Sequence, residues 1–193
     1  MSKSLLDQQA DKLLNELIEL IEEKWVLSTN IGKTCIQSFF QSYLKMSTEE
    51  GDQEVKESDF IENEINSDKL SSLSECNKNY ERLKIELENM NTYKNRLEQI
   101  NKNLNNLLKM DNGYFTEIDS DEFKLNLGQL VENYLKEFQL KKCLIEKYLF
   151  KARLKNECQI TLASLWINEP FLDEFLLFKL KSFIKYHLLK IKK

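Results

Sequence analysis

Residues 73–108 read LSECNKNYERLKIELENMNTYKNRLEQINKNLNNLL, and the spacing of their apolar side chains decides the fold. These side chains recur at alternating steps of three and four, which is the heptad pattern of a coiled-coil seam. Lys94 and Asn101 interrupt the seam, each beside a residue (Tyr93 or Ile100) that could rotate the stripe. The seam consists of Leu73, Cys76, Tyr80, Leu83, Leu87, Met90, Leu97, Leu104 and Leu108. We predict a helix over about residues 69–110, roughly 60 Å long at about 1.5 Å per residue.

A helix of that length needs a second long helix beside it, and the chain supplies one after Gly113. Asp119 and Glu122 resemble a capping box, and apolar residues then recur at helical spacing to about residue 155. The composition agrees, because four Gly and one Pro leave few turn formers among 193 residues. We predict an all-α fold, an elongated antiparallel helical bundle or coiled coil with short terminal helices.

The N-terminal segment contains two amphipathic stretches separated by Ser28, Thr29 and Asn30. The two stretches either fold back as a hairpin or run on with a kink, and we predict the hairpin. We therefore divide the chain into an N-terminal helical hairpin (1–46), an acidic disordered linker (47–68) and a long coiled-coil hairpin with C-terminal helices (69–193). All three belong to a single helical domain.

The linker, residues 47–68, contains nine acidic residues and one basic residue, Lys56. Its few apolar side chains do not offset the entropy of ordering, so we expect a solvated tether. Docking onto a basic partner, or phosphorylation at Ser58 or Ser67, is the functional alternative, and the sequence leaves this role open.

Charge and residue usage exclude several classes of function. The net charge of −4 gives no general attraction for nucleic acid, and the three arginines give little bidentate phosphate recognition. The four cysteines form no CxxC pair and there is one histidine, His187, so we expect no metal site and no cofactor. Residues 1–10 lack a signal-peptide core and no run of about 18 apolar residues occurs, so we expect a soluble intracellular protein.

Candidate catalytic motifs are weak. Gly32, Lys33 and Thr34 resemble the end of a phosphate-binding loop, but that loop needs a glycine where this chain has Leu27. The paired carboxylates all fall on polar helix faces or in the linker, where nothing raises their pKa for acid–base work. We predict no catalytic residue and no enzymatic activity.

The C-terminal segment is basic, because six lysines follow Phe171 against Asp173 and Glu174. Lysines late in a helix are favoured by its dipole, which is a structural explanation. A lysine tail that contacts membrane or a DNA backbone is the alternative. Apolar residues cover more than one face of this segment, which favours burial in a bundle or in a partner.

Residues 162–172, LASLWINEPFL, contain the only proline and one of two tryptophans. We predict a corner here: one helix ends near Ile167, the last helix begins near Pro170, and Asn168 or Glu169 caps it. Trp166 and Phe171 would fix the corner's angle by burial. Recognition of a partner by the same side chains is the alternative. The partner-binding or corner-packing candidates are Leu162, Trp166, Pro170, Phe171 and Leu172.

The same stretch resembles the C-terminal pattern of the cyclin-dependent kinase 2-interacting protein family. The residues that fit this pattern are Leu162, Ser164, Leu165, Trp166, Ile167, Glu169, Pro170, Phe171 and Leu172. Two further segments, NYLKEFQLKK (133–142) and LSTNIGKTCI (27–36), are similar to the family's long charged helix and to its Thr- and Asn-rich break. The three follow the family's chain order, and the likeness covers roughly residues 10–190.

The resemblance implies a non-enzymatic adaptor in the nucleus. It implies protein partners: cyclin-dependent and replication-origin kinases, a checkpoint kinase partner, and subunits of an AAA ATPase complex. The associated processes are the cell cycle, DNA replication, the DNA damage response and ribosome biogenesis. No direct contact with nucleic acid or membrane is expected.

Two other functions remain open alternatives to the adaptor. A homodimeric coiled-coil tether, such as a kinetochore or trafficking subunit, would use the 73–108 seam. A nucleic-acid-binding module would use the lysine tail.

Overall fold

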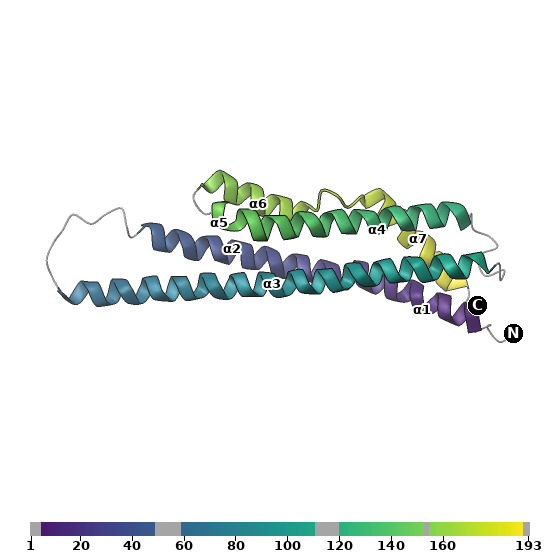
Figure 1. Ribbon diagram of the computed structural model, residues 1–193, viewed down its shortest axis with the longest axis horizontal. Coiled ribbons are helices and arrows are strands. Elements are labelled where there is room, and N and C mark those ends of the chain that lie inside the picture. Colours follow the sequence, from purple (N-terminus) through teal and green to yellow (C-terminus); the bar gives the residue numbers. More distant parts are fainter. Residues whose placement is uncertain (1–4, 49–58, 111–119, 153–154, 191–193) are drawn as a thin grey trace. The chain divides into compact units, whose positions relative to one another are not determined.

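The computed structural model describes residues 5–48, 59–110, 120–152 and 155–190 (Figure 1). Within these ranges nearly every residue is helical and no strand occurs, so the predicted all-α helical bundle is confirmed. The elements in chain order are α1 (Leu5–Glu19), the π-helix η1 (Leu20–Trp25), α2 (Val26–Thr48), α3 (Asp59–Lys109), α4 (Ser120–Cys143), the π-helix η2 (Leu144–Tyr148), α5 (Leu149–Ala152), α6 (Asn156–Asn168) and α7 (Glu174–Lys190).

The chain forms two compact units, and each unit combines segments that are distant in sequence. Unit 1 comprises Met1–Leu27, Asn89–Leu140 and Glu169–Lys193. Unit 2 comprises Ser28–Glu88 and Lys141–Asn168. These units do not follow the predicted division at residues 46 and 68, because α3 contributes its first half to one unit and its second half to the other.

The hairpin predicted for residues 1–46 is not found. α1, η1 and α2 follow one another without a break, and the backbone is right-handed helical at Glu19 and Val26, the residues that flank η1. Ser28 and Thr29 are helical and buried, because a helix neighbour covers them, as described below. The chain therefore continues in one direction through Ser28, Thr29 and Asn30, and the π-helical segment η1 joins α1 to α2 without a reversal.

Both ends of the range predicted as a linker, residues 47–68, are helical. α2 extends to Thr48 and α3 begins at Asp59, so helix enters the 47–68 range from both sides. Glutamate is a good helix former, and acidic residues are favoured in the first turn of a helix. Residues 49–58, including Ser58, lie outside the described residues.

Unit 1 packs the end of α3 and the helix α4 against α1, η1 and α7. Trp25 of η1 meets Tyr134 of α4 edge-on, with 4.8 Å between ring centroids. Phe123 of α4 stacks on Phe183 of α7 at 5.1 Å. These aromatic pairs join helices from three separate chain segments, so the core of unit 1 depends on contacts that are distant in sequence.

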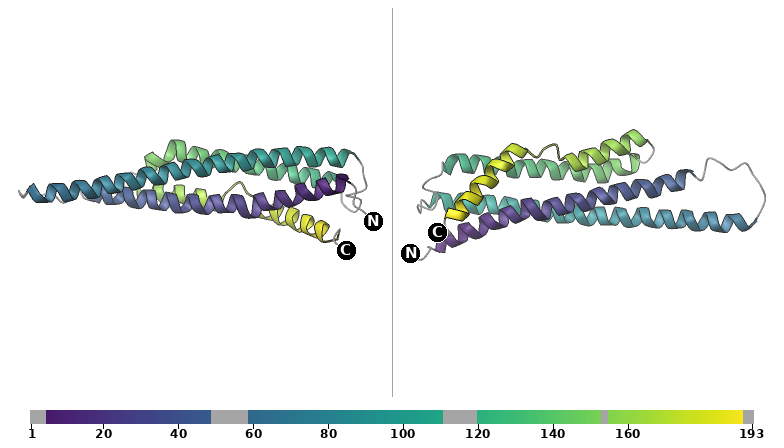
Figure 2. Two further views of the ribbon diagram at one scale, coloured as in Figure 1. Left: turned by 90° about the horizontal axis from the view of Figure 1, so that it is seen from below. Right: turned by 180° about the vertical axis from the view of Figure 1, so that it is seen from behind.

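Unit 2 packs α2 beside the first half of α3, as both views in Figure 2 show. The Cys76 thiol on α3 contacts the carbonyl of Phe39 on α2 at 3.5 Å. Phe150 of α5 completes the cluster, with ring centroids 5.7 Å from Phe39 and 5.0 Å from Tyr80. Burial raises the pKa of the Cys35 and Cys76 thiols, and all four cysteines are free.

The predicted seam on α3 is largely buried, with shifts at both ends. Leu73 is 49 % exposed, so the buried stripe begins at Cys76. Near the other end Ile100 is buried in place of Asn101, and Leu107 is more deeply buried than Leu108. Tyr80 is partly exposed, and the remaining seam residues are buried: Leu83, Leu87, Met90, Leu97 and Leu104. The buried stripe shifts around the axis of α3 because this helix packs against different segments in the two units.

Candidate functional site: the tryptophan corner and the outer face of α7

Trp166, near the end of α6, occupies a notch in helix α2. Its side chain is fully buried, and its indole N–H donates to the carbonyl oxygen of Thr29 at 3.0 Å. A Cβ atom on Gly32 would lie 2.2 Å from the Cζ2 atom of Trp166, which is closer than atoms can approach. Glycine is therefore required at position 32 for the indole to reach the backbone of α2.

Lys141, at the end of α4, is buried beneath the same tryptophan. Its Nζ donates to the Trp166 carbonyl oxygen at 2.6 Å and lies 4.5 Å from the centroid of the Trp166 ring. That carbonyl is one of the last four of α6, which have no partner within their own helix. Lys141 thus caps α6 and makes a cation–π contact, and these interactions help to offset the cost of burying an ammonium group.

Residues from the three segments that carry the family resemblance contact one another in unit 2. In unit 2, Thr29 and Gly32 come from LSTNIGKTCI, Lys141 from NYLKEFQLKK and Trp166 from LASLWINEPFL. Sequence reasoning missed the roles of Gly32 and Lys141. A glycine inside the apolar stripe of a helix is a signal of close approach, and it was available in the sequence.

The corner itself is a turn rather than a helix start. The backbone of Glu169 is left-handed, with φ of 46°, and the Leu172 N–H donates to the Glu169 carbonyl oxygen at 2.8 Å. Pro170 therefore lies in the first central position of this turn, which its fixed φ suits. α7 begins at Glu174, and the Asp173 carboxylate accepts the N–H groups of residues 175 and 176 at 2.9 and 3.0 Å.

Two predictions at the corner were wrong as a result. The last helix begins four residues beyond Pro170, and its cap is Asp173 rather than Asn168 or Glu169. Asp173 is an equally good cap by residue type. The left-handed backbone at Glu169 delays the helix, and this conformation has no strong signal in the sequence because the residue is not glycine.

Side chains of unit 1 hold the turn in place. The indole N–H of Trp25 donates to Glu169 Oε1 at 2.7 Å, and the Phe171 N–H donates to Glu137 Oε2 at 3.2 Å. Tyr134 is buried beside these carboxylates. Its burial, followed by the negative charges of Glu169 and Glu137, raises its pKa far above the ordinary value, so the phenol stays neutral.

The predicted site residues separate into two groups. Leu162 and Trp166 are buried and serve the fold of unit 2. Leu172 is partly exposed, Pro170 is exposed, and Phe171 is 44 % exposed. Trp166 therefore fits the packing interpretation, whereas Phe171 presents much of its ring to solvent and does not fix the corner by burial.

Helix α7 packs against the rest of unit 1 through one face. Leu176, Leu180 and Ile184 are buried on that face. Ion pairs border it: Lys179 with Glu122 of α4, and Lys181 and Lys185 with Glu22 of η1 at 3.2 and 2.9 Å. The hydrogen bond from Lys185 is the main reason that the pKa of Glu22 is lowered.

The opposite side of α7 is aromatic and open to solvent. Phe175, Phe178 and Tyr186 are 76 %, 67 % and 66 % exposed, and Ser182 between them is also exposed. At 3.6 residues per turn these four positions lie on one side of the helix. We call them the aromatic face of α7. Contiguous exposed apolar side chains of this kind are typical of protein–protein or membrane contact sites.

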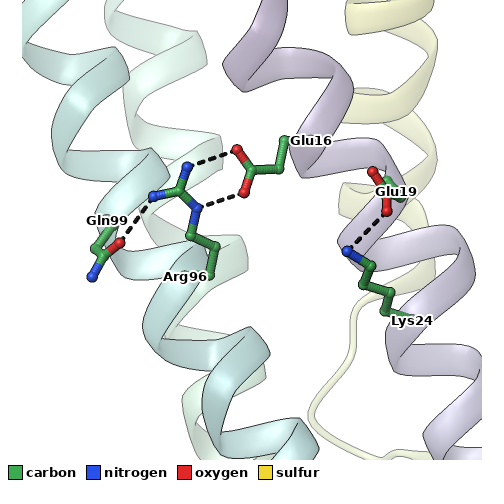
Figure 3. Close-up of polar contacts among 5 residues, drawn as sticks. All are labelled: Glu16, Glu19, Lys24, Arg96 and Gln99. Carbon is green, nitrogen blue, oxygen red and sulfur yellow. Dashed lines mark hydrogen bonds and ion pairs between the residues drawn. The ribbon is translucent and has the colours of Figure 1, made fainter.

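A second polar attachment joins α1 to α3 within unit 1 (Figure 3). The Arg96 guanidinium donates to both oxygens of Glu16, at 2.5 Å from Nε and 2.7 Å from Nη2, and to Gln99 Oε1 at 2.9 Å. This bidentate pair lowers the pKa of Glu16, chiefly through the hydrogen bond from Arg96. Lys24 pairs with Glu19 at 2.8 Å on the neighbouring turns.

Within the described ranges, no group of three or more His, Cys, Asp or Glu side chains is arranged to hold a metal ion. None of the helices described combines the length and the apolar character needed to cross a membrane.

No protein-family model matches this chain, and a search of curated proteins found no match. The likeness to the cyclin-dependent kinase 2-interacting protein family therefore remains a prediction from the three sequence segments.

Proposed function

We propose that the protein is a non-enzymatic adaptor subunit that binds larger proteins through an exposed helix face. The aromatic face of α7 is the observation that supports this function. Large aromatic side chains are the commonest anchors of protein interfaces, because they bury much surface while they lose few rotamers. Three of them side by side on a helix already held by unit 1 would form the centre of such an interface.

The proposed partners follow from the sequence resemblance. They are cyclin-dependent and replication-origin kinases, a checkpoint kinase partner, and the subunits of an AAA ATPase complex that acts on replication factors and in ribosome maturation. The proposed location is the nucleus. Residues of all three resembling segments contact one another around Trp166 in unit 2, and this shared structural role supports treating the segments as one pattern.

The homodimeric tether is less well supported. It would use the 73–108 seam, but most seam residues, including Leu83, Met90 and Leu97, are already buried by other segments of the same chain. A seam that is covered within one chain does not have its apolar surface available for a second copy.

The nucleic-acid-binding module is also less well supported. Three lysines of the tail, Lys179, Lys181 and Lys185, form ion pairs with Glu22 and Glu122. Each pair offsets the positive charge that phosphate contacts would need. Lys192 and Lys193 lie outside the described residues.

Affinity purification of the tagged full-length protein from its own cells, with mass spectrometry at physiological salt, tests the adaptor function. We expect recovery of AAA ATPase subunits or of replication kinases. The double variant Phe175→Ala/Phe178→Ala should lose them, because it removes the anchors. Leu125→Ala is the matched control, because Leu125 is an exposed apolar residue of α4 in the same unit. Recovery of neither class, or equal recovery with both variants, would contradict the proposal.

A further inference from the structure

Two lysines of α7 share one carboxylate oxygen of η1. The ammonium groups of Lys181 and Lys185 lie 3.2 and 2.9 Å from Oε1 of Glu22. The two lysines are four residues apart, so their charges lie on neighbouring turns of one side of the helix, where like charges repel. Glu22 attracts both lysines and screens their repulsion. Its loss should therefore weaken the attachment of α7 more than the loss of an ordinary surface ion pair.

The apolar attachment of α7 is confined to the opposite side from its aromatic face. Leu176, Leu180 and Ile184 are buried there, and Phe183 stacks on Phe123 of α4 with 5.1 Å between ring centroids. The side chains of the aromatic face add little burial. A helix that is held by one narrow apolar face and by surface ion pairs belongs to the less stable part of a fold.

The turn before α7 is held by side chains that lie outside this helix. The indole N–H of Trp25 donates to the carboxylate of Glu169 at 2.7 Å, and the Phe171 N–H donates to the fully buried carboxylate of Glu137 at 3.2 Å. Residues 172 and 173 follow the turn and are not helical, and α7 begins immediately after them. Movement of α7 about these two residues would therefore leave the turn in place.

We infer that α7 detaches from unit 1 as a whole helix about residues 172 and 173, while the preceding turn stays attached, and that Glu22 keeps α7 closed. Detachment uncovers Leu176, Leu180 and Ile184 together with the surface of unit 1 that they cover. The inference does not depend on the proposed adaptor function, because it concerns contacts within unit 1 alone. Any change that removes the charge of Glu22 should raise the population of the open state.

Native-state hydrogen exchange of the full-length protein tests the detachment. Backbone amides of residues 178–187 in α7 are compared with those of residues 127–140 in α4. A detached helix of 17 residues is marginal in water, so its amides should exchange whenever α7 opens. We expect them to exchange at least about tenfold faster than the amides of α4, through one shared opening.

The indole N–H of Trp25, followed by NMR, reports on the turn. It should exchange as slowly as the amides of α4, because its bond to Glu169 persists when α7 opens. Amides of α7 that exchange as slowly as those of α4, or that exchange progressively from one end of the helix, would overturn the inference. Exchange of the Trp25 indole at the rate of the α7 amides would also overturn it.

Glu22→Gln tests the role of the shared carboxylate, since it removes the charge and keeps the size of the side chain. The amides of α7 should exchange about three- to tenfold faster, as expected when two partly exposed ion pairs are lost, while those of α4 stay unchanged. Glu132→Gln is the matched control, because Glu132 forms an ion pair with Lys136 within α4. Equal acceleration in α4 and α7, or equal effects of the two variants on α7, would contradict the role of Glu22.

A mutant cycle tests whether Glu22 acts through the two lysines. Combining Glu22→Gln with Lys181→Gln and Lys185→Gln should give α7 exchange no faster than Glu22→Gln alone, because the carboxylate and its partners form one interaction. Exchange accelerated by the product of the separate effects would show that they act independently, and would overturn the inference. Thermal melting verifies that the variants fold, which is expected because none of these three side chains is buried.

Discussion

At the scale of single residues, Gly32 and Trp166 depend on each other. Glycine is normally a poor choice inside a helix, where alanine is better by about 0.5–1 kcal/mol. Position 32 is an exception because the indole of Trp166 occupies the space that a side chain would need. The glycine is thus explained by a residue far away in the sequence, and not by the helix that contains it.

Substituting Gly32→Ala should therefore destabilise the protein, by about 1–3 kcal/mol or more, because the new methyl group overlaps the indole. Gly128→Ala is the matched control: Gly128 is also helical, and a Cβ there has nothing within 4 Å. The control should gain about 0.5–1 kcal/mol. Urea unfolding followed by tryptophan fluorescence measures both changes, and equal signs for the two variants would contradict this explanation.

Lys141 gives a second prediction at this scale. Lys141→Met keeps most of the side-chain length but removes the charged donor to the Trp166 carbonyl oxygen. The loss should be about 1.5–3 kcal/mol, the usual contribution of a hydrogen bond to a charged group. Lys136→Met, in an exposed ion pair with Glu132, should change stability by less than about 1 kcal/mol. If both variants melt at the same temperature as the original protein, the capping role of Lys141 is wrong.

At the scale of elements, the attachment of α1 to α3 through Glu16 and Arg96 should depend on pH. Because the pKa of Glu16 is lowered in the folded state, its stabilising effect is present above the ordinary pKa of 4.5. The effect is lost as the pH falls through the lower, folded-state pKa. Glu22, whose pKa is lowered chiefly by Lys185, should act in the same direction between η1 and α7.

The test compares melting temperatures of the original protein and of Glu16→Gln from neutral to acidic pH. We expect the original protein to be more stable at neutral pH, with the difference shrinking below about pH 4.5. Gln99→Ala keeps the ion pair and removes only the neighbouring hydrogen bond. The difference in melting temperature between Gln99→Ala and the original protein should therefore not change with pH. A difference between Glu16→Gln and the original protein that stays constant across the range would argue against the ion pair.

At the scale of the whole molecule, periodicity was enough to predict the helical class but not the grouping of the helices. The spacing around Leu83, Met90 and Leu97 identified a buried stripe, because burial repeats with the helical period. The same pattern did not reveal that α3 serves two units. The pattern also predicted a helix break at Ser28 and Thr29, which are in fact buried within α2. Polar residues on a buried helix face can be recognised only when the neighbouring helix that covers them is known.

The candidate site was predictable to a similar degree. The composition of LASLWINEPFL marked a corner, since proline and tryptophan are rare in this chain. The sequence indicated that apolar residues cover more than one face of the last segment, but it did not indicate which of them face outward, because Phe175 and Phe178 look like core residues until the buried face of α7 is known. Assigning apolar residues to an inner or an outer face required the positions of Glu22 and Glu122, to which the lysines of α7 attach.

The bond between Trp166 and Thr29 has a consequence for synthesis of the chain. Its two residues are 137 positions apart. A ribosome that adds roughly 5–20 residues per second needs about 7–27 s to make that interval. During this time the notch at Gly32 has no indole to fill it, and unit 2 lacks α6 altogether. A newborn chain therefore leaves the part of α2 around Gly32 uncovered until α6 is made, which makes it a natural client for chaperones during translation.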